Sequence, residues 1–203
     1  MRPIAIIDDD IAVRDSLSML FETRHWPSLG FDSAEAFLGA ANVADFGCLI
    51  VDIRMTGMTG LELYGELKGA SYLPPVLFLT GHGDVPMAVA AIKDGAADFL
   101  EKPCDHRVLV AKVEQYLDAD QTARGDWEVR QHLAERLASL TPRERDVLRE
   151  LLVGRLNKQI ADVLDISIKT VEVHRARIYS KLKVRSGVEL AALLRDVDWD
   201  VSA

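Results

Sequence analysis

The first 117 residues alternate short apolar runs with longer segments in which apolar residues recur every three or four positions. The apolar runs are strand candidates, and they cover residues 4–7, 28–31, 48–51, 76–79 and 98–100. The segments between them have the spacing of amphipathic helices, as at Val13, Leu17, Leu20 and Phe21. Strands that alternate with helices form parallel sheets, so this pattern predicts an α/β domain with a doubly wound, five-stranded parallel sheet.

Polar residues mark the expected starts of several helices. A Ser, Thr or Asp followed three residues later by Glu indicates a capping box, in which each side chain bonds the other residue's backbone N–H. We expect capping boxes at Asp32 with Glu35 and at Thr59 with Glu62, and N-caps at Asp84 and Asp105.

Residues 118–138 differ in character, because they are polar and charged, contain Gly125 and carry only a thin apolar line through Leu133 and Leu137. We expect a partly helical linker that is broken at Gly125. Two interpretations of this segment stay open, a solvated spacer and a helix that dimerises.

From residue 139 onward the apolar patterning is helical only, and helices are expected over 157–164, 167–182 and 186–194. The sequence therefore predicts three parts: a first domain over 1–117, the linker over 118–138, and an all-α domain over 139–203.

The net charge of −8 over the whole chain, with a pI near 5.1, argues mildly against a nucleic-acid partner. That total averages two different parts, because residues 1–140 carry −10 and residues 141–203 carry +2. Within 155–185 there are 8 basic and 3 acidic side chains. The positive charge is therefore concentrated on one helical segment.

Two cysteines, Cys48 and Cys104, are far apart and belong to no Cys/His cluster, so neither a disulfide framework nor a zinc site is expected. The sequence also contains no apolar run near the 18 or so residues that span a bilayer, and no signal peptide is evident. We expect a cytoplasmic protein without a membrane partner.

Reactive side chains stand at the ends of the predicted strands. The first strand runs into Asp8 and Asp9, the third into Asp52, the fourth into Thr80, and the fifth into Lys102. These ends lie side by side in a doubly wound sheet. Clustered carboxylates repel one another unless a cation binds between them, and a few oxygen ligands suit Mg²⁺ together with a phosphate group. The pattern predicts a carboxylate nucleophile, Mg²⁺ and a phosphoryl group.

Four motifs together resemble the receiver domain of two-component response regulators, most closely the FixJ-like group, which has a flavodoxin-like fold. They are Ile7-Asp8-Asp9-Asp10, Val51-Asp52-Ile53-Arg54-Met55, the segment from Leu79 to Ala88, and Phe99-Leu100-Glu101-Lys102-Pro103. The resemblance implies the following roles: Asp52 as phospho-acceptor, Asp8, Asp9, Asp52 and the Arg54 carbonyl as Mg²⁺ ligands, Lys102 and Thr80 as phosphoryl contacts, and Thr80 with Phe99 as the switch.

Two residues depart from that family pattern. Thr56 stands where the family usually has Pro, and we expect it to loosen the loop beside Asp52, because Pro would fix φ there. Cys104 replaces a usual aromatic residue after Lys102-Pro103. We expect Cys104 to be packed as a small hydrophobic residue, with a redox role as the alternative.

The helix expected over 167–182 has an apolar stripe through Val171, Ile178 and Leu182 that should face a core. His174 falls on this stripe, so we expect a packed, hydrogen-bonded histidine. The opposite side is basic yet carries Val173, which suits contact with a thymine methyl group. A short turn separates this helix from the preceding one, so the pair predicts a helix-turn-helix.

Residues 139–195 resemble the LuxR/FixJ-type effector domain through Leu140-Thr141-Pro142-Arg143-Glu144-Arg145, Asn157-Lys158-Gln159-Ile160-Ala161 and Thr170-Val171-Glu172-Val173-His174-Arg175. The resemblance implies contacts with double-stranded DNA, split between phosphates and bases. The residues that it places at or near DNA are Lys158, Lys169, Thr170, Glu172, Val173 and Arg177.

Together these features predict a response regulator, not an enzyme, that accepts a phosphoryl group on Asp52 from a sensor histidine kinase and then binds DNA to regulate transcription. A homodimer formed through the first domain on phosphorylation is expected, with RNA polymerase as a further partner. One alternative is a haloacid-dehalogenase-like phosphatase with Asp8 as nucleophile. A second alternative is a receiver that acts as a phosphorylation-independent regulator or as a partner-binding module.

Overall fold

The computed structural model describes residues 1–81 and 85–195, so the N-cap expected at Asp84 and the last residues of the expected third part lie outside it. Contacts divide the chain into two compact units, Met1–Trp127 (the N-terminal unit) and Glu128–Ala203 (the C-terminal unit). Within the described residues, no helix is both long and apolar enough to cross a membrane.

The N-terminal unit alternates strands and helices, as expected. Its strands are β1 (Ile4–Ile7), β2 (Ser28–Phe31), β3 (Cys48–Asp52), β4 (Val76–Thr80) and β5 (Asp98–Glu101). Its helices are α1 (Ile11–Glu22), α2 (Ala34–Ala40), the short 3₁₀ helix η1 (Val43–Asp45), α3 (Gly60–Leu67), α4 (Val85–Lys93) and the first part of α5 (His106–Ala138). The five predicted strands are confirmed, three of them with one further residue at the carboxyl end.

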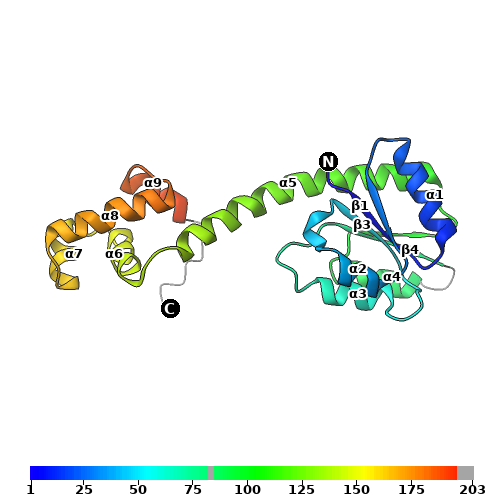
Figure 1. Ribbon diagram of the computed structural model, residues 1–203, viewed down its shortest axis with the longest axis horizontal. Helices are drawn as coiled ribbons and strands as arrows, with labels where there is room; N and C mark the ends of the chain where they lie inside the picture. The colour runs from blue at the N-terminus through cyan, green and yellow to red at the C-terminus, as the bar shows by residue number, and fades with distance from the viewer. Residues whose placement is uncertain (82–84, 196–203) are drawn as a thin grey trace. The chain divides into compact units, whose positions relative to one another are not determined.

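All strand pairs are parallel, and the strand order is β2-β1-β3-β4-β5. The three inner strands are apolar up to their carboxyl-terminal residues because helices cover both faces of the sheet (Figure 1). One face packs against α2, α3 and α4 through residues such as Phe37, Leu63 and Ala91. The other face packs against α1 and α5 through Phe21 and Val113. The doubly wound fold predicted from the alternation is therefore confirmed.

Helix caps agree with the sequence at two positions and differ at one. Thr59 and Glu62 form the expected capping box at the start of α3. Asp105 accepts a hydrogen bond from the Arg107 backbone N–H at 2.8 Å, as an N-cap does. The capping box expected at Asp32 was wrong, because Ser33 is the N-cap of α2 and accepts the bond from Ala36.

Helix α5 runs without interruption from His106 to Ala138, whereas the sequence predicted a break at Gly125. An interior glycine costs only about 1 kcal/mol relative to alanine, and the neighbouring Arg124 fixes the helix to the N-terminal unit. Its guanidinium donates to the carbonyls of Ala44 at 2.7 Å and Phe46 at 2.6 Å, and to the carboxylate of Asp120.

The Arg124 anchor extends to an aromatic pair. The Arg124 guanidinium lies 4.2 Å from the ring centroid of Tyr72, whose hydroxyl donates to Asp120 at 2.7 Å. The Trp127 ring lies against Tyr72 in a tilted arrangement, with 5.2 Å between the ring centroids and 52° between the planes. Arg124 and Asp120 are both about 95% buried, so these bonds satisfy two charges that would otherwise be costly to bury.

The described residues of the C-terminal unit form helices joined by short loops. After the end of α5 come α6 (Pro142–Leu152), α7 (Asn157–Leu164), α8 (Ile168–Leu182) and α9 (Gly187–Leu194). Thr141 and Glu144 form a capping box at the start of α6, with Pro142 in the first turn. The Glu144 carboxylate also accepts a hydrogen bond from Lys181 of α8 at 2.6 Å. Caps and this ion pair fix α6 to α8 over a common core.

Candidate functional site

The carboxyl ends of β1 and β3 bring two aspartates together. The strands pair in parallel with Ile7 beside Val51, so the next residues, Asp8 and Asp52, leave the sheet side by side. Asp8 is 1% exposed, whereas the side chain of Asp52 is 12% exposed. A buried carboxylate therefore lies next to one that a reactant can reach.

Lys102 reaches this pair from the end of β5. Its backbone N–H donates to the Thr80 carbonyl at 2.7 Å, which fixes the start of the loop after β5. Its Nζ lies 2.7 Å from Asp8 Oδ2 and 2.8 Å from Asp52 Oδ2. One ammonium group thus bridges both carboxylates.

Burial and these contacts shift the ionisation of the group. Desolvation raises the pKa of Asp8 above its ordinary value, even though Lys102 and the Asp10 N–H donate hydrogen bonds to it. For Lys102 burial acts to lower the pKa, but the hydrogen bonds to Asp52 and Asp8 outweigh it and hold the pKa above its ordinary value. Lys102 therefore stays protonated, and its single charge does not fully compensate the carboxylates.

A third carboxylate completes what we call the carboxylate cluster, Asp8, Asp9 and Asp52. One oxygen from each lies within 4.8 Å of the others. An all-oxygen donor set with a net negative charge fits a hard divalent cation such as Mg²⁺. The backbone N–H of Arg54 donates to Asp52 Oδ1 at 3.3 Å, which holds Asp52 against the following loop.

Thr80 and Phe99 lie near the cluster but contact other groups. Thr80, the last residue of β4, is fully buried, and its hydroxyl donates to the Gly81 carbonyl at 3.2 Å. Phe99 pairs in register with Phe78 on β4 and packs, half-buried, against the core under α3 and α4. The structure thus brings Asp8, Asp9, Asp52 and Lys102 together. The Thr80 hydroxyl instead bonds the carbonyl of the next residue.

The loop after β3 contains a contact that sequence reasoning missed. Thr56 was expected to loosen this loop, but its backbone N–H and its hydroxyl both donate to Asp9 Oδ2, at 3.0 and 3.1 Å. Further along, the Met58 N–H donates to Glu35 at 2.9 Å. The prediction considered only the φ freedom of Thr56 and not its two donors.

Cys104 behaves as expected from its size. It is half-buried and packs against the core that α1 and α5 cover. Burial raises the pKa of its thiol, which disfavours the reactive thiolate. The interpretation as a packed hydrophobic residue is confirmed.

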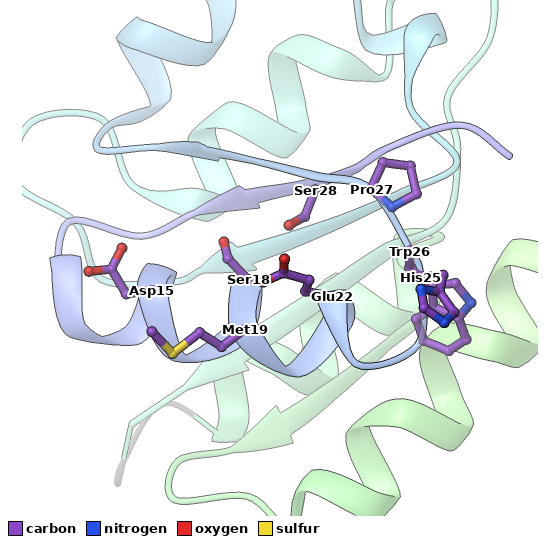
Figure 2. A pocket seen from close by; sticks show the side chains of 8 residues that line it. All are labelled: Asp15, Ser18, Met19, Glu22, His25, Trp26, Pro27 and Ser28. Atoms are coloured by element: carbon purple, nitrogen blue, oxygen red, sulfur yellow. The ribbon is translucent and has the colours of Figure 1, made fainter.

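An open hollow of about 520 Å³ on the N-terminal unit lies elsewhere. It is lined from α1 by Asp15, Ser18, Met19 and Glu22, and from the turn into β2 by His25, Trp26, Pro27 and Ser28 (Figure 2). None of the predicted site residues lines it. The hollow lies where β2 begins, whereas the carboxylate cluster lies at the carboxyl edge of the sheet.

In the C-terminal unit, α7 and α8 form the predicted helix-turn-helix. Asp165 ends α7 in the left-handed conformation, and Ser167 caps α8 by accepting a bond from the Thr170 N–H. Val171, Ile178 and Leu182 of α8 are buried in the core.

The side chains that the sequence placed at DNA lie on the outer side of these helices. Thr170 is half-buried, and Val173 is 43% exposed on α8. The remaining predicted residues are exposed, one on α7 and three on α8: Lys158, Lys169, Glu172 and Arg177. An exposed valine between charged residues leaves α8 with a face that suits both phosphates and base edges.

His174 differs from the expectation in one respect. The side chain is half-buried on the inner side of α8, as predicted, but its Nδ1 is buried and has no hydrogen-bond partner among the described residues. The helix periodicity gives its face correctly, whereas the partner of a ring nitrogen depends on tertiary contacts that periodicity does not encode.

Comparison with known proteins agrees with both units. Residues 4–114 match the response regulator receiver domain, and residues 138–194 match the bacterial regulatory proteins of the luxR family. The transcriptional regulatory protein FixJ of Bradyrhizobium diazoefficiens is 45% identical over 94% of this chain and 93% of its own length. The C4-dicarboxylate transport transcriptional regulatory protein DctR of Rhodobacter capsulatus is 40% identical over 94% and 98%.

Solved structures give the same result. The response regulator StyR is similar with a TM-score of 0.82 and 40% identity, over 96% of this chain and 99% of that chain. Full-length FixJ from B. japonicum is similar with a TM-score of 0.56 and 43% identity, over 96% of each chain.

A receiver domain and a luxR-type domain on one chain define a class of protein, the response regulators that control transcription. The chain belongs to this family, and the FixJ transcriptional regulators are among the proteins to which it is similar over nearly its whole length. Its domains imply a kinase partner and DNA binding. It is a transcription factor rather than an enzyme, so the phosphatase alternative is rejected.

Proposed function

We propose that Asp52 accepts a phosphoryl group from a sensor histidine kinase, and that the modified N-terminal unit promotes sequence-specific DNA binding by α7 and α8. The observation that carries this proposal is the ammonium of Lys102, held 2.7 and 2.8 Å from Asp8 and Asp52 at the carboxyl edge of a parallel sheet. The Lys102 ammonium can move its hydrogen bond from a carboxylate oxygen to a phosphoryl oxygen while it stays in the site.

In the transfer, an Asp52 carboxylate oxygen attacks the phosphorus of a phosphohistidine. The new P–O bond forms as the P–N bond to the imidazole breaks, and the histidine keeps the electron pair of that bond. Asp8, Asp9, Asp52 and the Arg54 carbonyl would hold Mg²⁺, which when bound neutralises charge on the phosphoryl oxygens. Lys102 would turn from Asp52 Oδ2 to a phosphoryl oxygen.

The donor needs a surface beside the cluster. A hollow of about 480 Å³ lies between α1 and the loop before α5, and Lys102 lines it together with apolar residues that include Val13, Leu17 and Leu79. An amphipathic helix of the kinase fits such a surface, and its histidine would then face Asp52. A regulator that receives its phosphoryl group in this way and binds the chromosome acts in the cytoplasm.

The phosphoryl group adds a charge of about −1.5 to −2 at the end of β3. We infer that the Thr80 hydroxyl then leaves the Gly81 carbonyl and donates to a phosphoryl oxygen, and that Phe99 on the neighbouring strand changes position with it. Met87 of α4 and Val108 of α5 are 42% and 46% exposed. These apolar side chains support a homodimer through the N-terminal unit.

Phosphorylation of Asp52 is tested by labelling with acetyl phosphate in the presence of Mg²⁺, followed by intact-mass analysis and peptide mapping. We expect label on Asp52 in the wild type and none in Asp52→Asn. Asp118→Asn, which changes an exposed aspartate of α5, is the matched control and should be labelled normally. Equal labelling of wild type and Asp52→Asn contradicts the proposal.

For DNA, we propose that Lys158, Lys169 and Arg177 contact phosphates, and that Thr170, Glu172 and Val173 lie at base edges. Selection from random DNA by beryllofluoride-treated protein gives the site. We then expect Lys169→Ala to weaken binding to all sequences and to lower the salt slope by about 1. Val173→Ala should instead change the preference at individual base pairs.

The beryllofluoride treatment also separates phosphorylation-dependent from phosphorylation-independent regulation. We expect beryllofluoride, a phosphoryl mimic, to produce a dimer in light scattering and to strengthen DNA binding. Two bound copies would then contact half-sites about one helical turn apart and present a joint surface to RNA polymerase. Equal DNA affinity with and without beryllofluoride would favour the alternative of a regulator that acts without phosphorylation.

A further inference from the structure

Thr56 makes two hydrogen bonds to a residue 47 positions away in the sequence. Its backbone N–H and its Oγ1 both donate to Asp9 Oδ2, at 3.0 and 3.1 Å. The bonds connect the loop between β3 and α3 with the loop between β1 and α1. They are therefore a direct link between the two loops that supply the carboxylate cluster.

Both donors of Thr56 meet the same oxygen of Asp9. A carboxylate oxygen has two lone-pair sites, so two hydrogen bonds saturate Oδ2 and leave Oδ1 to accept other partners. Asp9 is the exposed member of the cluster, whereas Asp8 is buried and Asp52 is half-buried. An exposed aspartate without such bonds would rotate about its side-chain torsions. The binding of a cation would then have to order this side chain, at a cost in conformational entropy.

The residue type matters at this position. Proline, which the family pattern usually has here, lacks an N–H and a hydroxyl and can make neither bond. Thr56 is also followed by Gly57, whose φ of 85° turns the chain, and then by Met58, whose N–H is fixed to Glu35 at 2.9 Å. The bond from Met58 to Glu35 thus fixes the far end of the loop, and a change at Thr56 leaves that bond in place.

We propose that Thr56 is a positioning residue that orients the Asp9 carboxylate for divalent cation binding. This inference rests on the proposed function in one respect, that Asp9 is a ligand of the cation. Groups that hold a metal ligand in place commonly change metal affinity by 10- to 100-fold when they are removed. Because Thr56 and Asp9 are exposed and water can replace one lost donor, we expect an effect at or below the lower limit of this range.

The test is a calorimetric titration of the metal-free, full-length protein with MgCl₂. Thr56→Val removes the hydroxyl but keeps the shape and the backbone N–H, and Thr56→Ser keeps both donors. We expect Thr56→Val to weaken Mg²⁺ binding about three- to tenfold, and Thr56→Ser to bind within about twofold of the wild type. Thr122→Val, on an exposed part of α5, is the matched control and should bind as the wild type does.

Two further readouts separate positioning from a general structural role. Thermal unfolding in EDTA should be unchanged in Thr56→Val. Labelling by acetyl phosphate should be slower at low Mg²⁺ but reach the wild-type rate at saturating Mg²⁺, because only the cation affinity changes.

Several results would overturn the inference. Equal Mg²⁺ affinity in wild type and Thr56→Val, or tighter binding in Thr56→Val, would show that the two hydrogen bonds do not prepare Asp9. Failure of Thr56→Ser to retain affinity would have the same meaning. If the wild type bound no Mg²⁺, the inference and the proposed function would fail together, whereas normal Mg²⁺ binding without labelling of Asp52 would remove the proposed function alone.

Discussion

Each unit of the chain contains a lysine bound to a buried carboxylate, and the two sites differ in charge balance rather than in distance. In the C-terminal unit, Lys181 Nζ lies 2.6 Å from Glu144 Oε2 and donates to the Ser139 carbonyl at 2.8 Å. In the N-terminal unit, Lys102 Nζ lies 2.7 and 2.8 Å from Asp8 and Asp52. Bond length alone does not distinguish them.

The charge count distinguishes them. Glu144 is 2% exposed, faces one ammonium and completes a capping box with Thr141. Burial acts to raise the pKa of Glu144, but the bonds from Lys181 and the Thr141 N–H outweigh it and hold the pKa below its ordinary value. The pKa of Asp8 is raised, chiefly by burial and further by the charge of Asp52, in spite of the bond from Lys102. Lys102 bonds two of the three carboxylates of the cluster. The Lys181–Glu144 pair is balanced in charge and stabilises the fold. The carboxylate cluster keeps an excess of negative charge, which a divalent cation can compensate.

The largest effect is expected when the balanced pair is broken. Lys181→Met leaves the Glu144 carboxylate buried without its ammonium partner, and removal of one partner of such a pair costs about 3 kcal/mol. Urea unfolding with hydrogen exchange resolved by peptide would place the loss in the C-terminal unit. Lys169→Met, at an exposed position on α8, should stay within about 0.5 kcal/mol of the wild type. A loss below about 1 kcal/mol in Lys181→Met would contradict our interpretation of the pair.

A smaller and reversible effect is expected for Lys102→Met. Without divalent ions, this variant should lose about 2 kcal/mol of stability, because Asp8 then faces two carboxylates without compensation. Saturating Mg²⁺ should restore most of the loss, since it supplies the missing positive charge. The same addition should leave Lys181→Met unchanged. Restoration of both variants, or of neither, would mean that the two sites do not differ as described.

Mg²⁺ should also stabilise the unmodified protein, in one unit only. At a free concentration ten times the dissociation constant, binding to the folded state adds about 1.4 kcal/mol. Protection from hydrogen exchange should rise in peptides around β1, β3 and the loops that follow them, and not in α6 or α8. Equal protection of both units would argue against a site at the carboxylate cluster.

The smallest effect is a pH dependence of the C-terminal unit. Because the pKa of Glu144 is lowered on folding, its contribution to stability is fully present above the ordinary value of 4.5 and is lost as the pH falls through the folded value. Unfolding of wild type and Glu144→Gln, followed from pH 6 downward, measures this contribution. The wild type should lose stability more steeply than the variant, and parallel curves would exclude Glu144 as the source.

The fold and the centre of the site follow from the sequence because both depend on local pattern. Alternating strands and helices require a parallel sheet, and a parallel sheet places all its carboxyl ends on one edge. The convergence of Asp8, Asp52 and Lys102 could therefore be predicted without coordinates. The N-cap at Ser33 could not, because Asp32 and Ser33 are both good caps and only the exact start of α2 decides between them.

Contacts between distant loops could not be predicted. Thr56 meets Asp9 because two loops happen to lie at hydrogen-bond distance, and no periodicity records that. The uninterrupted course of α5 through Gly125 has the same origin, since tertiary bonds from Arg124 outweigh the local preference for a break. Sequence patterns predict which face of a helix is buried and where a strand ends. Contacts between residues that are distant in the sequence can be seen only in the packed structure.

The Arg124 anchor has a consequence for where the N-terminal unit can be cut. A fragment that stops at residue 117 keeps all five strands but removes Arg124 and Asp120. The buried carbonyl of Phe46 then loses its donor, the Tyr72 hydroxyl loses its acceptor, and Trp127 no longer covers the Tyr72 ring. A fragment that ends just after Trp127 retains every one of these contacts. We therefore expect a fragment of this regulator to need about ten residues beyond 117 to keep these contacts.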